Sequence, residues 1–150
     1  MNTVGIGDIG EMVAITKFTK KGFIVSKPLS NVAKYDFIVE IQDKLYRVQV
    51  KTTESTKDEG AKMNFSTKTT NYEKGHWKSN KYSSEEIDLF FLYCLENDWS
   101  GLFIPVTSIE IPFTLSLRLT PPKNNQTKGI NFAKDYEFEK QLGSLTQSAE

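Results

Sequence analysis

The sequence predicts an α/β protein with a mixed sheet, and three observations carry that prediction. One segment near the N-terminus has the apolar spacing of a helix. Residues 35–52 alternate like two strands joined by a polar turn, and residues 88–95 form a continuous apolar run that is typical of a buried strand. With 150 residues, the stretch 1–150 is expected to fold as one domain that buries a core of ordinary size.

The first expected element is a helix over residues 8–21. Its apolar side chains recur every three or four residues between Ile9 and Phe18, and Gly22 stands where a helix commonly ends. A short strand over residues 23–26 is expected to follow.

Glu11 has two interpretations within this helix. Asp8 can cap the helix with Glu11 three residues later, which is the spacing of a capping box and gives Glu11 a structural role. Glu11 also shares a helical face with Ile15 and Phe18, which is an unusual place for a merely solvated acid. The sequence therefore leaves a functional role for Glu11 open.

The next segment, YDFIVEIQDKLYRVQVKT at 35–52, predicts a β-hairpin with a polar face. Side chains alternate between the two faces of a strand, so Asp36, Gln49 and Lys51 fall on the same face. With a two-residue turn at 43–44, the predicted pairs across this face are Asp36 with Lys51, Ile38 with Gln49, and Glu40 with Arg47. Two cross-strand ion pairs on a solvated face, each worth roughly 0.2–1 kcal/mol, are the simplest interpretation.

Residues 54–82 are polar and basic, and an extended loop or excursion is expected there. Nine Lys or Arg stand against four Asp or Glu between positions 44 and 81, whereas residues 85–117 hold six acids and no base. The formal net charge of zero therefore hides one basic surface and one acidic region.

The remaining expected elements are strands over 88–95, 101–106 and 114–119, while the tail 121–150 gives little information. Cys94 is expected to be a packed thiol, and one cysteine forms neither a disulfide nor a zinc cluster. No apolar run reaches the length of a membrane span and the start lacks the pattern of a signal peptide, so a cytoplasmic protein is expected.

The spacing of four residues resembles the active-site pattern of the PD-(D/E)xK nucleases. These residues are Glu11 on the helix, Asp36 on the first hairpin strand, and Gln49 and Lys51 on the second. YDFIV and VQVKT, followed by YSSEEIDLFFLYC and LFIPV, resemble the small homing endonucleases of cyanobacterial group I introns, and the likeness covers residues 5–119. Tyr35 replaces the proline of the family name, and Gln49 replaces an acid, which removes one negative charge.

This resemblance implies an α/β, restriction-endonuclease-like PD-(D/E)xK core with a mixed central sheet and flanking helices. It also implies a site-specific, Mg²⁺-dependent DNA endonuclease that makes double-strand breaks in intron homing, with Mn²⁺ able to substitute. The implied catalytic residues are Glu11, Asp36, Gln49 and Lys51. The implied metal ligands are Asp36, Gln49, the carbonyl of Val50, and Glu11.

Double-stranded DNA is the implied partner of the basic segment 54–82. The candidate contact residues are Lys62, Lys68, Asn71, Tyr72, Lys74, His76, Trp77, Lys78 and Lys81. The lysines can instead form a solvated face, and Tyr72 and Trp77 can instead form the core of a small subdomain. Cutting both strands needs two sites, so self-association as a dimer or tetramer is expected, with residues 85–117 either as an interface or as ordinary central sheet.

Two other functions remain open. A Holliday-junction resolvase or a restriction-like endonuclease would use the same core chemistry on a different DNA. A non-catalytic DNA-binding module of the same fold is favoured by Gln49, which can simply satisfy a hydrogen bond at a sheet edge.

Overall fold

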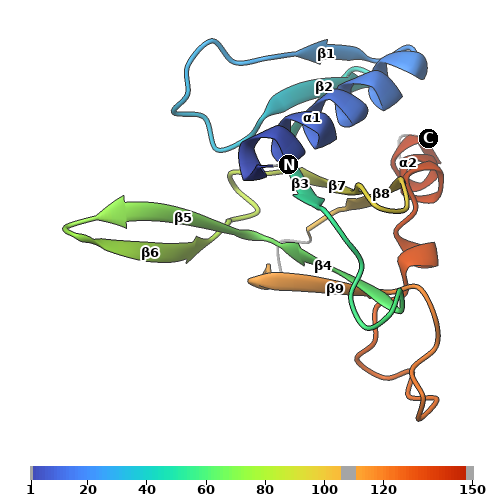
Figure 1. Cartoon of the computed structure of the whole chain (residues 1–150). Coiled ribbons are helices and arrows are strands. Elements are labelled where there is room, and N and C mark those ends of the chain that lie inside the picture. The colour runs from blue at the N-terminus through green and yellow to red at the C-terminus, as the bar shows by residue number, and fades with distance from the viewer. Residues whose placement is uncertain (1, 106–110, 148–150) are drawn as a thin grey trace.

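The computed structural model describes residues 2–105 and 111–147 and has a five-stranded mixed sheet at its centre (Figure 1). The strands lie in the order β1 (Ile24–Ser26), β2 (Phe37–Ile41), β3 (Lys44–Thr53), β7 (Leu89–Cys94) and β8 (Trp99–Phe103). β3 and β7 run parallel, and the other neighbouring strands run antiparallel. The predicted α/β class with a mixed sheet is confirmed.

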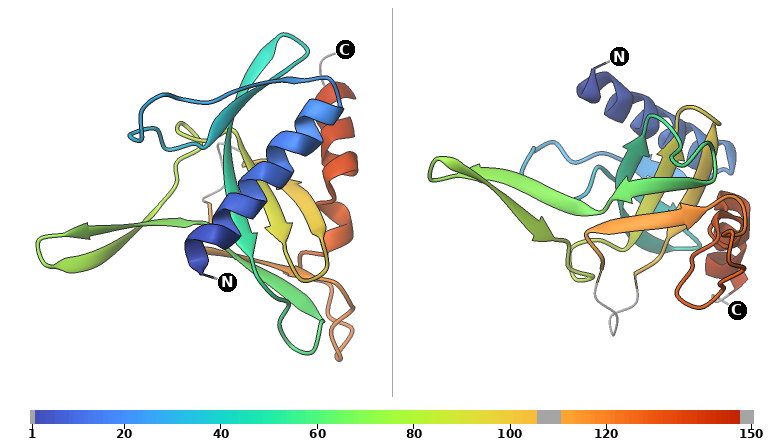
Figure 2. Two further views of the ribbon diagram at one scale, coloured as in Figure 1. Left: turned by 45° about the horizontal axis from the view of Figure 1, so that its top comes forward. Right: turned by 60° about the horizontal axis from the view of Figure 1, so that its bottom comes forward.

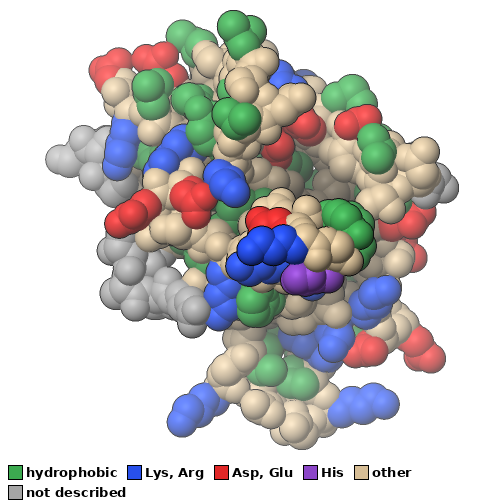
Figure 3. Space-filling model, turned by 90° about the vertical axis from the view of Figure 1, so that its left-hand side faces the viewer, with side chains coloured by type: hydrophobic (Ala, Val, Ile, Leu, Met, Phe, Trp, Pro, Cys, Tyr) green, Lys and Arg blue, Asp and Glu red, His purple; other side chains and the backbone are tan. Residues whose placement is uncertain are grey.

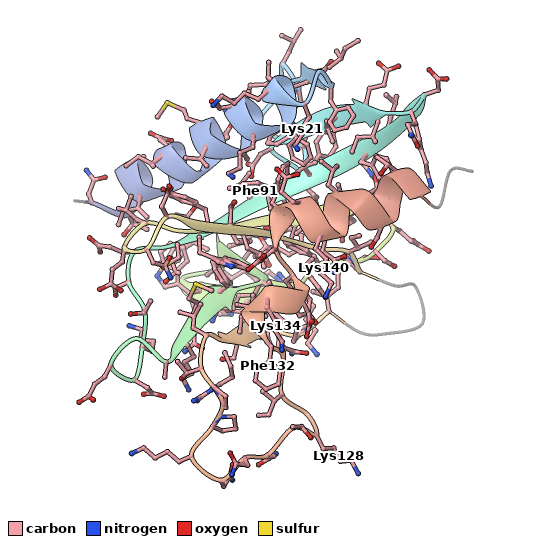
Figure 4. All side chains as sticks on the ribbon, turned by 90° about the vertical axis from the view of Figure 1, so that its right-hand side faces the viewer. Lys21, Phe91, Lys128, Phe132, Lys134 and Lys140 are labelled. Atoms are coloured by element: carbon pink, nitrogen blue, oxygen red, sulfur yellow. The ribbon has the colours of Figure 1, made fainter. Side chains whose placement is uncertain are left out.

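Two helices, α1 (Thr3–Lys20) and α2 (Phe138–Gln147), cover one face of this sheet (Figure 4). The ring of Phe91 on β7 lies 6.1 Å from the ring of Phe18 on α1 and 5.8 Å from the ring of Phe138 on α2. Burying each such side chain contributes roughly 1.5–3 kcal/mol. The aromatic cluster therefore holds both helices on the sheet.

A two-stranded ribbon covers the opposite face. β4 (Lys62–Ser66) pairs antiparallel with β9 (Thr114–Arg118), and Figure 2 shows this pair lying across the central strands. Alternate residues of the ribbon point inward and form a second core with one face of β7, composed of Met63, Phe65, Leu115, Leu117, Phe90, Leu92 and Cys94. Cys94 is the buried free thiol that the sequence predicts.

The apolar runs of residues 85–117 are the buried strands β7 and β8, so ordinary central sheet accounts for them. The outer edge of β8 is also covered, since the N–H of Leu102 donates to the carbonyl of Tyr136 at 2.9 Å, just ahead of α2 and after a short 3₁₀ turn at Ala133–Asp135. Residues 106–110, which include the end of the strand predicted at 101–106, lie outside the described residues.

Of the two expectations for residues 54–82, an extended loop or an excursion, the loop is wrong. This segment contains β4 and then a hairpin of β5 (Lys68–Glu73) and β6 (His76–Lys81), which projects from the body (Figure 1). We call residues 68–81 the arm. Its turn is Lys74–Gly75, with the two consecutive positive φ values of 50° and 85° that a tight hairpin turn uses.

α1 begins at Thr3 and not at residue 8. Asn2 is its N-cap, and the side-chain oxygen of Asn2 accepts a hydrogen bond from the N–H of Gly5 at 2.8 Å. Asp8 and Glu11 therefore lie inside the helix, and the capping-box interpretation is wrong. Three glycines among residues 5–10 lower the helix propensity of the first turns, which explains the late predicted start. No described helix is long and apolar enough to cross a membrane.

The β2–β3 hairpin is confirmed, but its register differs from the prediction. The turn is at 42–43, where φ values of 51° and 64° are both positive. Glu40 therefore lies opposite Leu45, and Arg47 lies opposite Ile38. Moving the turn by one residue changes each partner by two positions, so every side chain keeps its predicted face.

α1 and β3 approach each other closely at Gly10. A Cβ built at Gly10 would lie 1.9 Å from the Oγ1 of Thr52 and 3.1 Å from its Cβ, so a residue with a side chain does not fit. The same contact buries the Oγ1 of Thr52 without a hydrogen-bond partner among the described residues. This approach sets how far the next residue, Glu11, reaches toward the sheet.

We predict that Gly10→Ala lowers the free energy of unfolding by about 1–3 kcal/mol, because the added methyl group must push α1 away from Thr52. Gly7→Ala is the matched control on the same helix. Nothing lies within 4 Å of a Cβ at Gly7, so this change should stabilise by up to about 1 kcal/mol through helix propensity. Urea denaturation measures both, and equal stability of the two variants would contradict the close contact.

Candidate active site

The candidate site lies just before β2 begins, alongside the part of β3 that runs on past it. The last pair of their ladder joins Phe37 to Val48, and β3 then runs on to Thr53. The N–H of Asp36 donates to the carbonyl of Val48 at 2.8 Å, and the Oδ2 of Asp36 accepts from the N–H of Val50 at 2.7 Å. The carboxylate of Asp36 therefore takes the place of a strand neighbour for Val50 and is fixed at the edge of β3.

The two charged groups at this edge both have shifted pKa values. Burial raises the pKa of Asp36, the hydrogen bond from Val50 opposes that shift, and the negative charge of Glu11 adds to it. Burial lowers the pKa of Lys51, and the charge of Asp36 partly offsets this effect. Such opposed shifts in neighbouring groups are typical of functional sites.

Lys51 shares a strand face with Gln49, as predicted, but its ammonium group points to the arm. The Nζ of Lys51 donates to the carbonyl of Lys68 at 3.1 Å and to the hydroxyl of Tyr82 at 3.2 Å. It also lies 4.9 Å from the centre of the Tyr82 ring. These contacts replace the direct pair with Asp36 that the predicted register implied, and Asp36 acts on Lys51 through its charge.

Glu11 reaches the site from α1. Its half-buried carboxylate accepts a hydrogen bond from the Nζ of Lys27, and this bond raises the pKa of Lys27. The negative charge of Glu11 also acts to raise the pKa of Asp36. A cavity of about 270 Å³ beside Glu11 is lined also by Asp8, Met12, Ile15 and Lys27. A larger cavity of about 610 Å³ between α1 and α2 is lined by none of the candidate catalytic residues.

Sequence reasoning missed two residues of this site. Lys27 lies in a loop ahead of Pro28, where no periodic pattern marks it. Tyr82 follows the polar strand β6 and is the first side chain after the arm to return to the core, where it is 8% exposed. An isolated aromatic residue at the end of a polar run was the available signal for Tyr82.

The oxygen atoms gathered here suit a hard cation. The carboxylates of Asp36 and Glu11, the amide oxygen of Gln49 and the carbonyl of Val50 are the ligand types that Mg²⁺ prefers. The Nε2 of Gln49 donates to the carbonyl oxygen of Val50 at 3.5 Å, so this side-chain amide lies beside that carbonyl. Within residues 2–105 and 111–147, no three His, Cys, Asp or Glu side chains gather closely enough to hold a metal ion. A cation at this edge would therefore need the amide and carbonyl oxygens as well as the carboxylates.

An ion pair ties β3 to the start of β7 next to the site. The Nε of Arg47 donates to the Oδ2 of Asp88 at 3.0 Å, and the backbone N–H of Arg47 donates to the same oxygen at 2.8 Å. The guanidinium group also donates to the carbonyl of Glu85. Arg47, which was predicted to pair with Glu40, thus braces the parallel β3–β7 junction.

The aromatic side chains of the arm are exposed to solvent. Tyr72 and Trp77 lie opposite each other, with ring centres 5.2 Å apart, and they are 61% and 71% exposed. The alternative that they form a small core is therefore wrong. Figure 3 shows the side of the molecule that bears the arm, where the single histidine, His76, lies beside lysine and apolar side chains.

All but one of the predicted DNA-contact residues belong to the arm. Those on the arm are Lys68, Asn71, Tyr72, Lys74, His76, Trp77, Lys78 and Lys81. Lys62 lies apart on β4, where its Nζ is 3.3 Å from a carboxylate oxygen of Asp58. Lys81 is at the base of the arm, with its Nζ 4.9 Å from the centre of the Phe113 ring.

We predict that Asp36→Asn raises the free energy of unfolding at pH 7 by about 0.5–2 kcal/mol. The pKa of Asp36 is raised in the folded chain, so its contribution to stability is present at low pH and is lost as pH rises through that pKa. The amide keeps an oxygen for the N–H of Val50 and removes the buried charge. Thermal unfolding at pH 7 and near about pH 3 measures the gain, which should shrink at the lower pH.

Asp88→Asn is the control of opposite sign. Burial acts to raise the pKa of Asp88, but the hydrogen bonds from Arg47 outweigh it and hold the pKa below its ordinary value. The contribution of Asp88 is therefore present above its unfolded pKa and is lost on acidification, so this variant should be less stable than wild type at pH 7. A loss of stability in both variants at pH 7 would contradict the buried-charge account of Asp36.

Comparisons with known proteins place this chain in a family. A sequence profile described as PD-(D/E)XK endonuclease matches residues 1–139. A solved structure described as that of a bacterial homing endonuclease, I-Ssp6803I, is similar with a TM-score of 0.74 and 21% identity, covering 99% of this chain and 96% of that chain. No curated protein matches the chain. At 21% identity, the structural similarity shows the fold. The sequence profile spans most of the chain and shows the family. The chain belongs to the PD-(D/E)XK endonuclease family.

Proposed function

We propose that this protein is a site-specific, metal-dependent DNA endonuclease that makes double-strand breaks by phosphodiester hydrolysis. The observation that carries the proposal is the arrangement of Asp36, Val50 and Lys51 at the edge of β3 in a chain of an endonuclease family. The finer part of the proposal is a role as a group I intron homing endonuclease, which the likeness to a bacterial homing endonuclease supports.

The candidate catalytic residues have separate roles in this proposal. Asp36, Glu11, Gln49 and the carbonyl of Val50 would hold Mg²⁺, or Mn²⁺ in its place. When bound, such a cation neutralises charge that develops on the phosphate and lowers the pKa of an attacking water. Lys51 would hold its ammonium group beside the phosphate and orient that water.

The arm is the proposed DNA-contacting part of the segment 54–82. Each of its strands has six residues, so the ribbon is about 20 Å long. The major groove of DNA is wide enough to admit a two-stranded ribbon. One face of the arm presents Asn71, Lys78 and His76, and the other presents Lys68, Lys81 and the two aromatic rings. Both faces therefore offer cations for phosphates, and one offers an amide for base edges.

Self-association as a dimer or tetramer is part of the proposal. One chain offers one Asp36–Lys51 site, whereas a double-strand break requires hydrolysis on two antiparallel strands. A two-fold symmetric pair would present two sites related as the strands are. Light scattering of the free chain and of its DNA complex counts the copies, and a monomer in both states would exclude this assembly.

Two alternatives are kept, and one of them has the support of a single observation. A non-catalytic DNA-binding module is favoured by Gln49, which stands where the family pattern has an acid. A junction resolvase or restriction-like enzyme would share the site but act on a different DNA. Cleavage decides against the first alternative, and preference for a linear duplex over a four-way junction separates the second.

We predict that the purified chain with Mg²⁺ or Mn²⁺ cuts members of a randomised duplex library, and that Asp36→Ala and Lys51→Ala each lower the cleavage rate by at least about 100-fold. The loss follows because the first variant removes the main carboxylate and the second removes the cation beside the phosphate. Sequencing of captured ends measures cutting, and fluorescence anisotropy measures binding, which should change little.

Glu139→Ala and Lys128→Ala are matched controls with the same losses of charge at exposed positions on α2 and on the loop after β9. Figure 4 shows Lys128 on that loop. Both controls should cut like wild type. Undiminished cutting by purified Asp36→Ala would show that the site lies elsewhere.

We predict that single Lys74→Ala and Lys78→Ala changes weaken binding to all duplex sequences alike. Each phosphate neutralised by the arm contributes a slope of about −0.9 to log K against log salt, so each variant should flatten the slope by roughly one unit. Binding titrations between low and moderate salt measure it, with Lys128→Ala as the control. A slope unaltered in both arm variants would move the DNA surface away from the arm.

A further inference from the structure

The ammonium group of Lys51 is hydrogen-bonded at the base of the arm, where its two strands meet the body of the protein. Its first acceptor is the carbonyl of Lys68, the first residue of β5, and its second is the hydroxyl of Tyr82, the residue after β6. Lys68 and Lys81 form the first pair of the arm ladder, so both acceptors stand at the same end of the hairpin. Lys51 therefore joins the candidate active site to the base of the arm.

Tyr82 is a rigid partner for this lysine. Its side chain is buried, and its ring packs edge to face on Phe90 with centres 5.5 Å apart. Burial raises the pKa of Tyr82 to about 12, so the hydroxyl keeps its proton at neutral pH, and Thr69 on β5 forms a further side-chain hydrogen bond with it. The oxygen that accepts from Lys51 thus has a fixed position.

The base of the arm is hydrogen-bonded to the body of the protein, whereas its tip is exposed to solvent. The N–H of Thr67 donates to the carbonyl of Phe113 at 2.9 Å, and its buried hydroxyl donates to the carbonyl of Pro112 at 2.5 Å. Tyr72 and Trp77 near the tip are mostly exposed. A lone two-stranded hairpin is only marginally stable in water. The contacts at the base of the arm therefore determine how the arm is oriented.

We propose that Tyr82, together with the carbonyl of Lys68, is a positioning residue for Lys51. A lysine side chain has about 2 kcal/mol of rotamer entropy, and two fixed acceptors select one direction for its ammonium group. The base of the arm then sets the position of the Lys51 ammonium group for hydrolysis, and the tip of the arm sets the affinity for DNA. The inference rests on the proposed function, in which Lys51 stands beside the phosphate.

Tyr82→Phe keeps the ring and removes the hydroxyl. The single-turnover cleavage rate at saturating DNA should fall roughly 10- to 100-fold, the cost expected when a charged group loses one hydrogen-bond partner. The Kd for DNA and the Tm should stay near wild type. Trp77→Ala at the tip should instead raise the Kd for DNA.

Tyr93→Phe is the matched control. The hydroxyl of Tyr93 is also bonded, to the Oδ1 of Asp98 at 2.6 Å, but Tyr93 packs in the core beneath α1 and α2, whereas Tyr82 belongs to the core on the opposite face of the sheet. This variant should cut like wild type. If Tyr82 acts through Lys51, Tyr82→Phe should also add little to the loss already caused by Lys51→Arg.

A measurement without cleavage separates this inference from the proposed function. An ordered ammonium group exchanges its protons slowly, so ¹⁵N spectra of the metal-free protein should show a distinct Lys51 Nζ signal. That signal should be lost in Tyr82→Phe and retained in Tyr93→Phe. A signal and a rate both unchanged in Tyr82→Phe would overturn the positioning role. Failure of the wild type to cut any DNA, with the signal behaving as expected, would overturn the nuclease proposal and leave the positioning in place.

Discussion

The candidate site depends on one hydrogen bond, from the backbone N–H of Val50 to the carboxylate of Asp36. The β2–β3 ladder ends at the pair of Phe37 and Val48, so β3 continues past the end of its antiparallel neighbour. A buried backbone N–H without a partner costs about 1–3 kcal/mol. The oxygen of Asp36 removes that cost by accepting the hydrogen bond, but the carboxylate loses its own hydration. The need to satisfy a strand edge thus draws a carboxylate with a raised pKa to the strand that also carries Lys51.

The elements packed around β3 fix the position of the strand edge at Val50. β3 lies between β2 and β7, with α1 packed on one face and β4 adjoining the far part of the strand. The contact of Gly10 with Thr52 fixes how deeply α1 sits and therefore where Glu11 arrives. Buried charges at the site oppose stability, while two apolar cores on the two faces of the sheet provide it. The proposed function and the stability of the fold therefore depend on different side chains of the same strands.

Strand alternation places Gln49 and Lys51 on one face of β3 in either register, because moving the turn by one residue shifts partners by two and preserves the faces. The catalytic interpretation of these residues, and of Asp36 and Glu11, comes from the resemblance to the PD-(D/E)xK pattern. The arm escaped prediction because both of its faces are exposed, so no apolar alternation marks its strands. Tyr82 and Lys27 escaped it because their roles depend on contacts with Lys51 and Glu11 that only the tertiary fold creates.

The edge of β3 is the proposed metal-binding centre of a nuclease. Anomalous diffraction from crystals of the protein soaked in Mn²⁺ tests it most directly, because the ion reports its own position. The account predicts a peak within coordination distance of the Asp36 carboxylate and the Val50 carbonyl, which disappears in Asp36→Ala crystals. A peak confined to His76 or another surface position, with Asp36 bonded only to the N–H of Val50, would contradict it.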